Sequence, residues 1–131
     1  MEQVFISYKY TGIDKIELKK ELEFISSRLE NIGYKTYIVT RDIQKWQEIE
    51  LSNKMIKESL EELKKSDIFF CYIKSAEKSE GMLIEYGYAK ALGKKTIVFC
   101  KKGVNTFFVK RLADIYIEYE DLGEIEKITK L

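Results

Sequence analysis

Apolar and polar positions along the chain fall into two alternating patterns. Short apolar runs of strand length are separated by longer stretches in which apolar residues recur every three or four positions, as on one face of a helix. The run Asp67 to Ile73 (DIFFCYI) is almost wholly apolar, which is typical of a strand covered on both faces of a sheet. We predict strands at Val4–Ile6, Tyr34–Val39, Asp67–Ile73, Thr96–Cys100 and Ile115–Tyr119.

Helical periodicity fills the intervals between these strands. In the first interval Asp14 and Glu17 resemble a capping box, and Gly33 stands where a helix-ending glycine is expected. The predicted helices run from about Asp14 to Asn31, Ile49 to Lys65 and Gly81 to Leu92, with a terminal one over Leu122 to Leu131. Thr40 to Glu48 and Lys74 to Glu80 are polar connections.

Strands that alternate with helices indicate right-handed βαβ crossovers and a mostly parallel sheet. We therefore expect one α/β domain over residues 1–131, a flavodoxin-like three-layer sandwich with a five-stranded sheet in the order 2-1-3-4-5. In that order the ligand crevice lies beyond the carboxyl ends of strands one and three, where the winding reverses. The residues after Ile6 and after Ile73 are therefore expected to form the site.

The amino-acid composition excludes several kinds of partner and catalytic site. With 23 basic and 22 acidic side chains the net charge is +1, so no general positive field attracts nucleic acid or an anionic membrane. The absence of His excludes Ser-His-Asp triads, His general bases and His-containing metal sites. Cys71 and Cys100 lie inside apolar runs and indicate reduced thiols, so we expect a cytoplasmic protein. No metal or cofactor is expected.

Glu85 is the candidate reacting group. It lies in the first turns of a predicted helix whose amino end faces the crevice, where the helix dipole favours an ionised carboxylate. Such a carboxylate can attack or stabilise the oxocarbenium-like carbon that forms when an N-glycosidic bond breaks. A helix cap or a salt bridge near the helix start explains the same spacing equally well.

Other candidate residues follow the predicted strands, and each has a structural alternative. Arg41 either contacts a diphosphate or pairs with its neighbour Asp42. Trp46 and Tyr10 either line the site or pack on an apolar face. The expected substrate-binding residues are Ser7, Tyr8, Lys9, Arg41, Ser79 and Gly81.

Three stretches resemble the Toll/interleukin-1 receptor (TIR) domain, one of which, Ile56 to Ile68, is similar to its helix leading into the third strand. Val4-Phe5-Ile6-Ser7-Tyr8 is similar to its first strand, and the residues from Leu29 to Ile43 are similar to its second strand and the loop that follows. Enzymatic TIR domains cleave NAD at the nicotinamide N-glycosidic bond with a Glu on the helix after strand three, a position that Glu85 matches. A Pro-Gly turn usual in that loop is replaced here by Lys45-Trp46-Gln47.

A shorter and denser pattern resembles the nucleoside 2-deoxyribosyltransferases and related deoxynucleoside-monophosphate hydrolases. Gly81-x-x-x-Glu85-x-Gly87-x-Ala89, followed by Gly93-Lys94, is similar to their signature, in which the Glu is the nucleophile. The resemblance implies that Gly87 and Ala89 let the helix pack closely on a strand. It also implies that Ser79 occupies the place of a phosphate-binding Ser in the hydrolases, where the transferases have an Asp.

Both resemblances imply cleavage of an N-ribosyl bond of a nucleotide substrate. Nicotinamide leaves NAD as a neutral molecule and needs no strong general acid, which suits a chain without His. We therefore expect a TIR-like NAD hydrolase or ADP-ribosyl cyclase with a defence or signalling role, and a homo-oligomer. The alternatives are a nucleoside 2-deoxyribosyltransferase or a 2′-deoxynucleoside 5′-monophosphate N-hydrolase, and a non-catalytic TIR-like interaction module.

Overall fold

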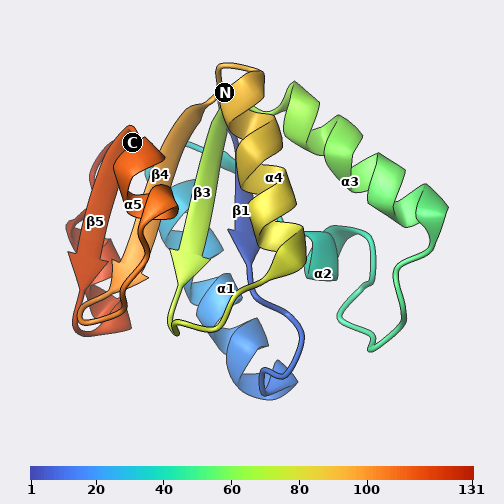
Figure 1. Cartoon of the computed structure of the whole chain (residues 1–131), viewed down its shortest axis with the longest axis horizontal. Coiled ribbons are helices and arrows are strands. Elements are labelled where there is room, and N and C mark those ends of the chain that lie inside the picture. Colours follow the sequence, from blue (N-terminus) through green and yellow to red (C-terminus); the bar gives the residue numbers. More distant parts are fainter.

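All five predicted strands form, and every neighbouring pair in the sheet is parallel. A computed structural model describes residues 1–131 and gives the strand order β2-β1-β3-β4-β5. The labelled arrows in Figure 1 point the same way, and β2 pairs in parallel with β1, so the carboxyl ends of the strands share one edge of the sheet. The strands are β1 (Gln3–Tyr8), β2 (Lys35–Tyr37), β3 (Ile68–Ile73), β4 (Lys95–Lys101) and β5 (Ile115–Tyr119).

Helices cover both faces of this sheet, which gives the three layers expected from the sequence. The first face packs against α1 (Lys15–Asn31) and the 3-10 helix η1 (Leu122–Lys127). The second face packs against α3 (Asn53–Lys65), α4 (Glu80–Ala91) and the short α5 (Phe108–Leu112). Figure 1 shows α4 lying across the front of β1 and β3, with α1 behind the sheet.

Alternation along β1 decides which residue meets which helix. Val4 and Ile6 belong to the core on the α1 face, whereas Phe5 belongs to the core on the α4 face. Because side chains alternate along a strand, Ser7 lies on the same face as Phe5 and is directed at α4. In the β1–β3 pairing Ser7 is the partner of Cys71, so two small side chains lie side by side under α4.

The chain between β2 and α3 differs from the sequence prediction. β2 ends at Tyr37, and a short helix, α2 (Val39–Asp42), begins where a strand and then a loop were expected. The Asp42 carboxylate accepts the N–H of Ile38 at 2.8 Å and so turns the chain into α2. Lys45 and Trp46 then adopt the left-handed conformation, with φ of 55° and 62°. Two residues without glycine's freedom therefore make the turn.

Three other boundaries also differ. α3 begins at Asn53 rather than Ile49, because Ser52 caps it by accepting the N–H of Met55. The terminal element is a 3-10 helix that ends at Lys127, not a helix to Leu131. α5 was not predicted, since Val109 is its one buried residue, and Phe108 and the preceding Phe107 are mostly exposed.

The signature glycine of α4 does not act as the family resemblance implies. Ala89 is fully buried against the sheet, as expected for close packing. A Cβ added at Gly87, however, would meet nothing within 4 Å, and this residue is exposed. Close approach of helix and strand is therefore not the reason for a glycine at this position.

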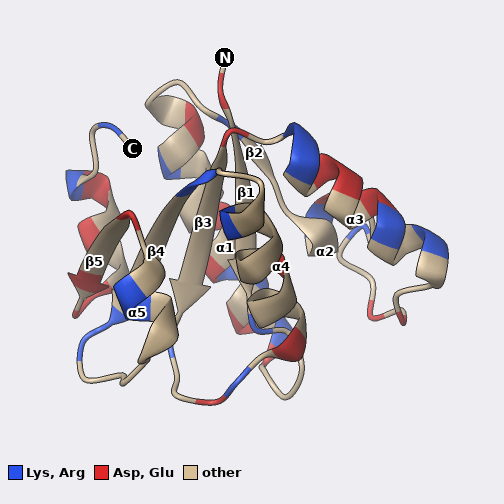
Figure 2. Ribbon diagram, turned by 45° about the horizontal axis from the view of Figure 1, so that its top comes forward, with Lys and Arg blue, Asp and Glu red and all other residues tan.

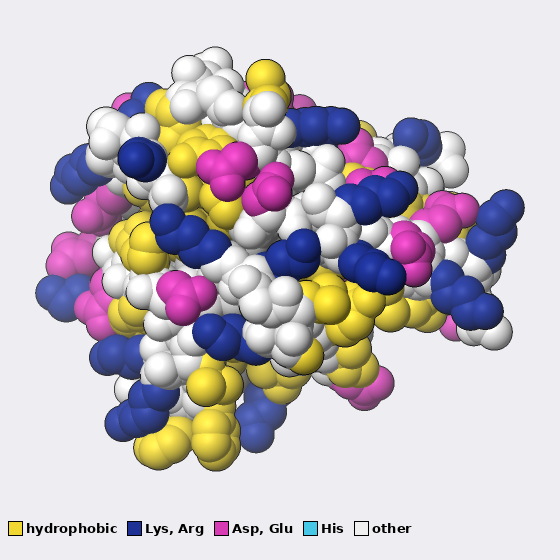
Figure 3. Space-filling view, turned by 90° about the horizontal axis from the view of Figure 1, so that it is seen from above, with side chains coloured by type: hydrophobic (Ala, Val, Ile, Leu, Met, Phe, Trp, Pro, Cys, Tyr) yellow, Lys and Arg dark blue, Asp and Glu magenta, His cyan; other side chains and the backbone are white.

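Charges of both signs are spread over the molecule. Figure 2 shows Lys and Glu alternating along α3, whereas α4 carries few charges between its ends. On the face seen in Figure 3, Lys and Arg side chains are interspersed with Asp and Glu. None of the helices is both long enough and apolar enough to cross a bilayer.

Candidate active site

A cavity of about 620 Å³ opens at the carboxyl end of β1, between the amino end of α4 and the connection that precedes α3. This is the crevice that the strand order predicts, since β1 and β3 are the strands from which the winding reverses. Six residues expected from the sequence line it: Tyr8, Lys9, Tyr10, Ser79, Gly81 and Glu85.

Glu85 reaches this cavity from the second turn of α4. Its Oε1 accepts a hydrogen bond from the Ser7 hydroxyl at 2.6 Å, a short distance typical of a hydroxyl bonded to a carboxylate. The carboxyl group is largely surrounded by protein and faces the cavity on its remaining side. A carboxylate so placed can meet a sugar carbon bound in the cavity.

The protonation of Glu85 differs from the expectation that its ionised form is favoured. Burial raises the pKa of Glu85 to about 7, and the hydrogen bond from Ser7 only partly opposes this rise. Desolvation of the charged form therefore outweighs the helix dipole. Near neutral pH both protonation states are therefore populated, and the ionised fraction supplies the carboxylate that a nucleophile requires.

Ser7 does not line the cavity, contrary to its expected role in binding substrate. Its side chain is 1% exposed and lies behind Glu85, between β1 and α4. The alternation that directs Phe5 to the α4 face directs Ser7 there as well. Ser7 therefore contacts the reacting carboxyl group and not the cavity.

The amino end of α4 forms one rim of the cavity. Ser79 caps the helix by accepting the N–H of Met82 at 3.2 Å, and the Ser79 carbonyl accepts the N–H of Leu83. No hydrogen bond within the chain engages the backbone N–H of Glu80 or Gly81. Free N–H groups at a helix start are a favourable place for an anionic oxygen.

Tyr8, Lys9 and Tyr10 form the wall that follows β1. The Tyr8 hydroxyl accepts the N–H of Thr40 at 2.9 Å and also contacts the Thr40 hydroxyl, which fixes its ring. Burial raises the pKa of Tyr8 well above its ordinary value, so it is neutral. Tyr10 is stacked beneath the Lys15 ammonium, 3.8 Å from the ring centroid.

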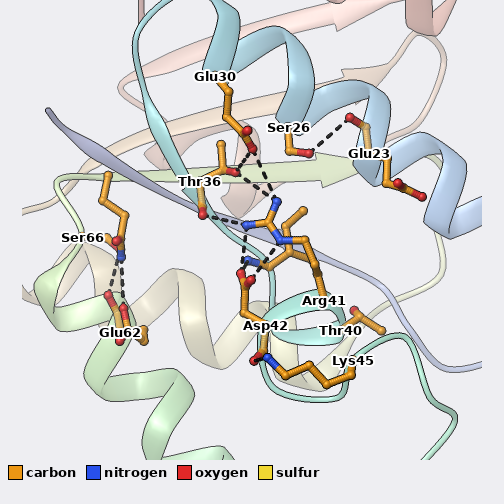
Figure 4. Close-up of polar contacts among 12 residues, drawn as sticks. Glu23, Ser26, Glu30, Thr36, Thr40, Arg41, Asp42, Lys45, Glu62 and Ser66 are labelled. Atoms are coloured by element: carbon orange, nitrogen blue, oxygen red, sulfur yellow. Dashed lines mark hydrogen bonds and ion pairs between the residues drawn. The ribbon is translucent and has the colours of Figure 1, made fainter.

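Arg41 lies outside the cavity, so its expected contact with a diphosphate is not supported. Figure 4 shows its guanidinium enclosed by protein acceptors. It pairs with Asp42 at 2.9 Å, donates to the Thr36 carbonyl at 2.8 Å and lies 3.5 Å from Glu30. The structural alternative, a pair with Asp42, is the arrangement that forms.

Trp46 also lies outside the cavity, in accord with its structural alternative. It packs against the core on the α1 face, with the Lys19 ammonium 5.4 Å from its ring centroid. Cys71 and Cys100 are fully buried free thiols on neighbouring strands, as their apolar surroundings predicted. No group of three or more Cys, Asp or Glu side chains has the arrangement of a metal site.

Six polar residues that the sequence did not single out also line the cavity. Gln44 is buried and donates from Nε2 to the Ile49 carbonyl at 2.7 Å, while no hydrogen bond within the chain engages its Oε1. No motif marks these residues, which come from the connections and from α3 and α4. The six are Thr11, Gln44, Glu50, Ser59, Lys78 and Glu80.

Comparison with known proteins agrees with this geometry. The family model described as nucleoside 2-deoxyribosyltransferase matches residues 16–125, whereas no curated protein matches the chain. Among solved structures, the CMP N-glycosidase BcmB of Clostridium botulinum has a TM-score of 0.71 and 23% identity, over 96% of this chain and 95% of that one.

Two further structures share the fold. The 2-deoxyribosyltransferase of Bacillus psychrosaccharolyticus has a TM-score of 0.71 and 19% identity, over 96% of this chain and 91% of that one. The 2-deoxyribosyltransferase of Leishmania mexicana has a TM-score of 0.61 and 16% identity, over 76% of this chain and 65% of that one. Because the family model covers most of the chain, this protein belongs to the nucleoside 2-deoxyribosyltransferase family, enzymes that cleave or transfer N-glycosidic bonds.

Proposed function

We propose that this protein hydrolyses the N-glycosidic bond of a nucleoside 5′-monophosphate, with Glu85 as the nucleophile. The observation that carries the proposal is the position of the Glu85 carboxyl group on the cavity wall, with lysines and free helix N–H groups at the same opening. This extends one alternative named above, a 2′-deoxynucleoside 5′-monophosphate N-hydrolase, to nucleoside monophosphates in general. Family membership supports such a reaction better than cleavage of NAD.

In the first step the free Glu85 oxygen attacks the anomeric carbon, and the bond from that carbon to the base breaks. The base departs with the electron pair and takes a proton from water. In the second step water attacks the anomeric carbon of the glycosyl ester and restores the carboxylate. The products are the free base and a pentose 5-phosphate.

Preference for a phosphorylated substrate is supported at the rim. Lys9, Lys78, Ser79 and the free N–H groups of Glu80 and Gly81 are the groups that bind phosphate best. Glu50 and Glu80 also line the cavity, but both are exposed and screened by solvent. The match to a CMP N-glycosidase, a nucleotide-cleaving enzyme of the same fold, is in keeping with this preference.

The test compares nucleotides with their nucleosides. The protein is incubated with CMP, dCMP, the purine monophosphates, the corresponding nucleosides and NAD, and free base is followed by chromatography. We expect base release from monophosphates, and Glu85→Gln to reduce it at least about a thousandfold. A concentration series belongs in the assay, because self-association remains part of the proposal.

Ser79→Asp is the sharper variant, since Asp caps a helix as well as Ser does but repels phosphate. We expect it to raise KM for monophosphates about tenfold or more and to leave any nucleoside activity unchanged. Release of base from nucleosides alone, with transfer of the sugar to an added second base, would indicate a transferase instead. Nicotinamide release from NAD, lost in Glu85→Gln, would restore the original expectation.

A further inference from the structure

We propose that Ser7 is a positioning residue, which holds one oxygen of Glu85 so that the other faces the sugar carbon. The inference rests on the proposed function, because it concerns the nucleophile of that reaction. It assigns to Ser7 a role different from the substrate binding expected from the sequence.

When Glu85 is ionised and able to react, the hydrogen bond between Ser7 and Glu85 has only one possible direction. The Ser7 hydroxyl has a single proton, and an ionised carboxylate only accepts, so Ser7 donates to Oε1 at 2.6 Å. Ser7 is 1% exposed and its hydroxyl has no other partner within the chain. Oε2 of Glu85 makes no hydrogen bond within the chain and is left to react.

No other group near Glu85 replaces this donor. Burial raises the pKa of Tyr8, Tyr37 and Cys71 further above their ordinary values, so all three stay protonated near neutral pH. None of them donates a hydrogen bond to Glu85. The charged groups that line the cavity with Glu85 are Lys9, Glu50, Lys78 and Glu80. Neither these nor the other polar side chains of the lining form a hydrogen bond with Glu85.

The register of the sheet makes room for this arrangement. Ser7 and Cys71 are direct partners across β1 and β3, and both are small. The next residues on the same face, Phe5 and Ile73, are large and buried. The pair of small residues therefore leaves a hollow in the sheet where the Glu85 carboxyl group can lie. A side chain much larger than that of Ser or Thr at position 7 would push the carboxyl group toward the cavity.

The test combines activity with a direct titration. The pKa of Glu85 is measured by carbon NMR of glutamate-labelled protein, with Glu85→Gln identifying its signal, in the wild type, Ser7→Ala and Ser7→Thr. In Ser7→Ala we expect the pKa to rise by about one unit, kcat to fall about tenfold to a hundredfold, and KM to change less than about twofold. Ser7→Thr retains a hydroxyl, so we expect its Glu85 pKa and its kcat to be close to those of the wild type.

Other outcomes overturn the inference. An unchanged pKa and kcat in Ser7→Ala would show that the hydrogen bond has no functional role. A rise in KM with kcat unchanged would return Ser7 to substrate binding. If Ser7→Ala does not fold, Ser7→Cys keeps the volume with a weaker donor and takes its place. Because the titration needs no substrate, it decides the positioning role even where no nucleotide is cleaved.

Discussion

The Lys9 ammonium lies 3.9 Å from the Glu77 carboxylate, which joins the loop after β1 to the loop after β3 at the opening of the candidate site. Glu77 is largely exposed, so this ion pair is weak, but it competes with any phosphate that Lys9 would bind. We expect Glu77→Gln to lower KM for a nucleoside monophosphate about threefold at low salt, measured by initial rates. Glu120→Gln, which breaks an exposed ion pair with Lys102 of 2.9 Å, serves as the matched control. A KM that rises in Glu77→Gln would contradict this role of Lys9.

The raised pKa of Glu85 predicts a stability that depends on pH. The pKa is about 7 in the folded state against an ordinary value of 4.5, so the folded state retains a proton that the unfolded chain releases. The contribution of the buried acid to stability is therefore complete below the lower value and is lost as the pH rises through the upper one.

Glu85→Gln removes this dependence. At about pH 8 we expect the variant to exceed the wild type in free energy of unfolding by on the order of 2 kcal/mol, reduced for the partial exposure of the carboxyl group. Near pH 4 the difference is expected to be small. Urea unfolding at both pH values measures this difference in free energy of unfolding. If the difference is the same at pH 8 and pH 4, the pKa of Glu85 is not raised.

Arg41 is expected to matter for stability and not for catalysis. Its guanidinium joins the Thr36 carbonyl to Asp42, whose carboxylate also holds the N–H of Ile38. Arg41→Ala is expected to destabilise the fold by about 1–2 kcal/mol, because these acceptors lose a charged donor. Thermal unfolding and KM are measured together. A large rise in KM at unchanged stability would place Arg41 in the site after all.

Lys45 offers a test of the turn after α2. Its φ of 55° is costly for a residue with a Cβ, and its side chain makes one hydrogen bond, to the Asp42 carbonyl. We expect Lys45→Gly to stabilise the fold by about 0.5–1 kcal/mol and Lys45→Val to destabilise it by at least as much, as measured by urea unfolding. Destabilisation by glycine would mean that the hydrogen bond outweighs the strain.

Much of the fold could be predicted because its signals are local. The all-apolar run from Ile68 to Ile73 is fully buried as the central strand, and Asp14 caps α1 as expected. The predicted strand order gave the position of the crevice, and Glu85 was the carboxylate expected beside it. What escaped prediction depends on contacts between distant segments, such as the bond from Tyr8 to Thr40 that shapes the chain around α2.

The candidate site was predicted in part for the same reason. Ser79, Gly81 and Glu85 lie together because one helix carries them. Arg41 and Trp46 follow β2, at the edge of the sheet where the site lies. However, the Arg41 guanidinium pairs with Asp42, and the Trp46 ring packs against the core. The burial that raises the pKa of Glu85 comes from packing of α4 on the sheet, which no local pattern encodes.

The two buried free thiols, Cys71 and Cys100, can be used to measure how often the sheet opens. Cys71 and Cys100 lie in β3 and β4, the middle of the sheet, and neither is exposed. A thiol reagent can modify them only when these strands open, so the labelling rate reports the free energy of that opening. Cys71 pairs across the sheet with Ser7, which is hydrogen-bonded to Glu85, so a ligand that fills the cavity should slow modification of Cys71. Mass spectrometry of labelled peptides could then detect ligand binding without any assay of turnover.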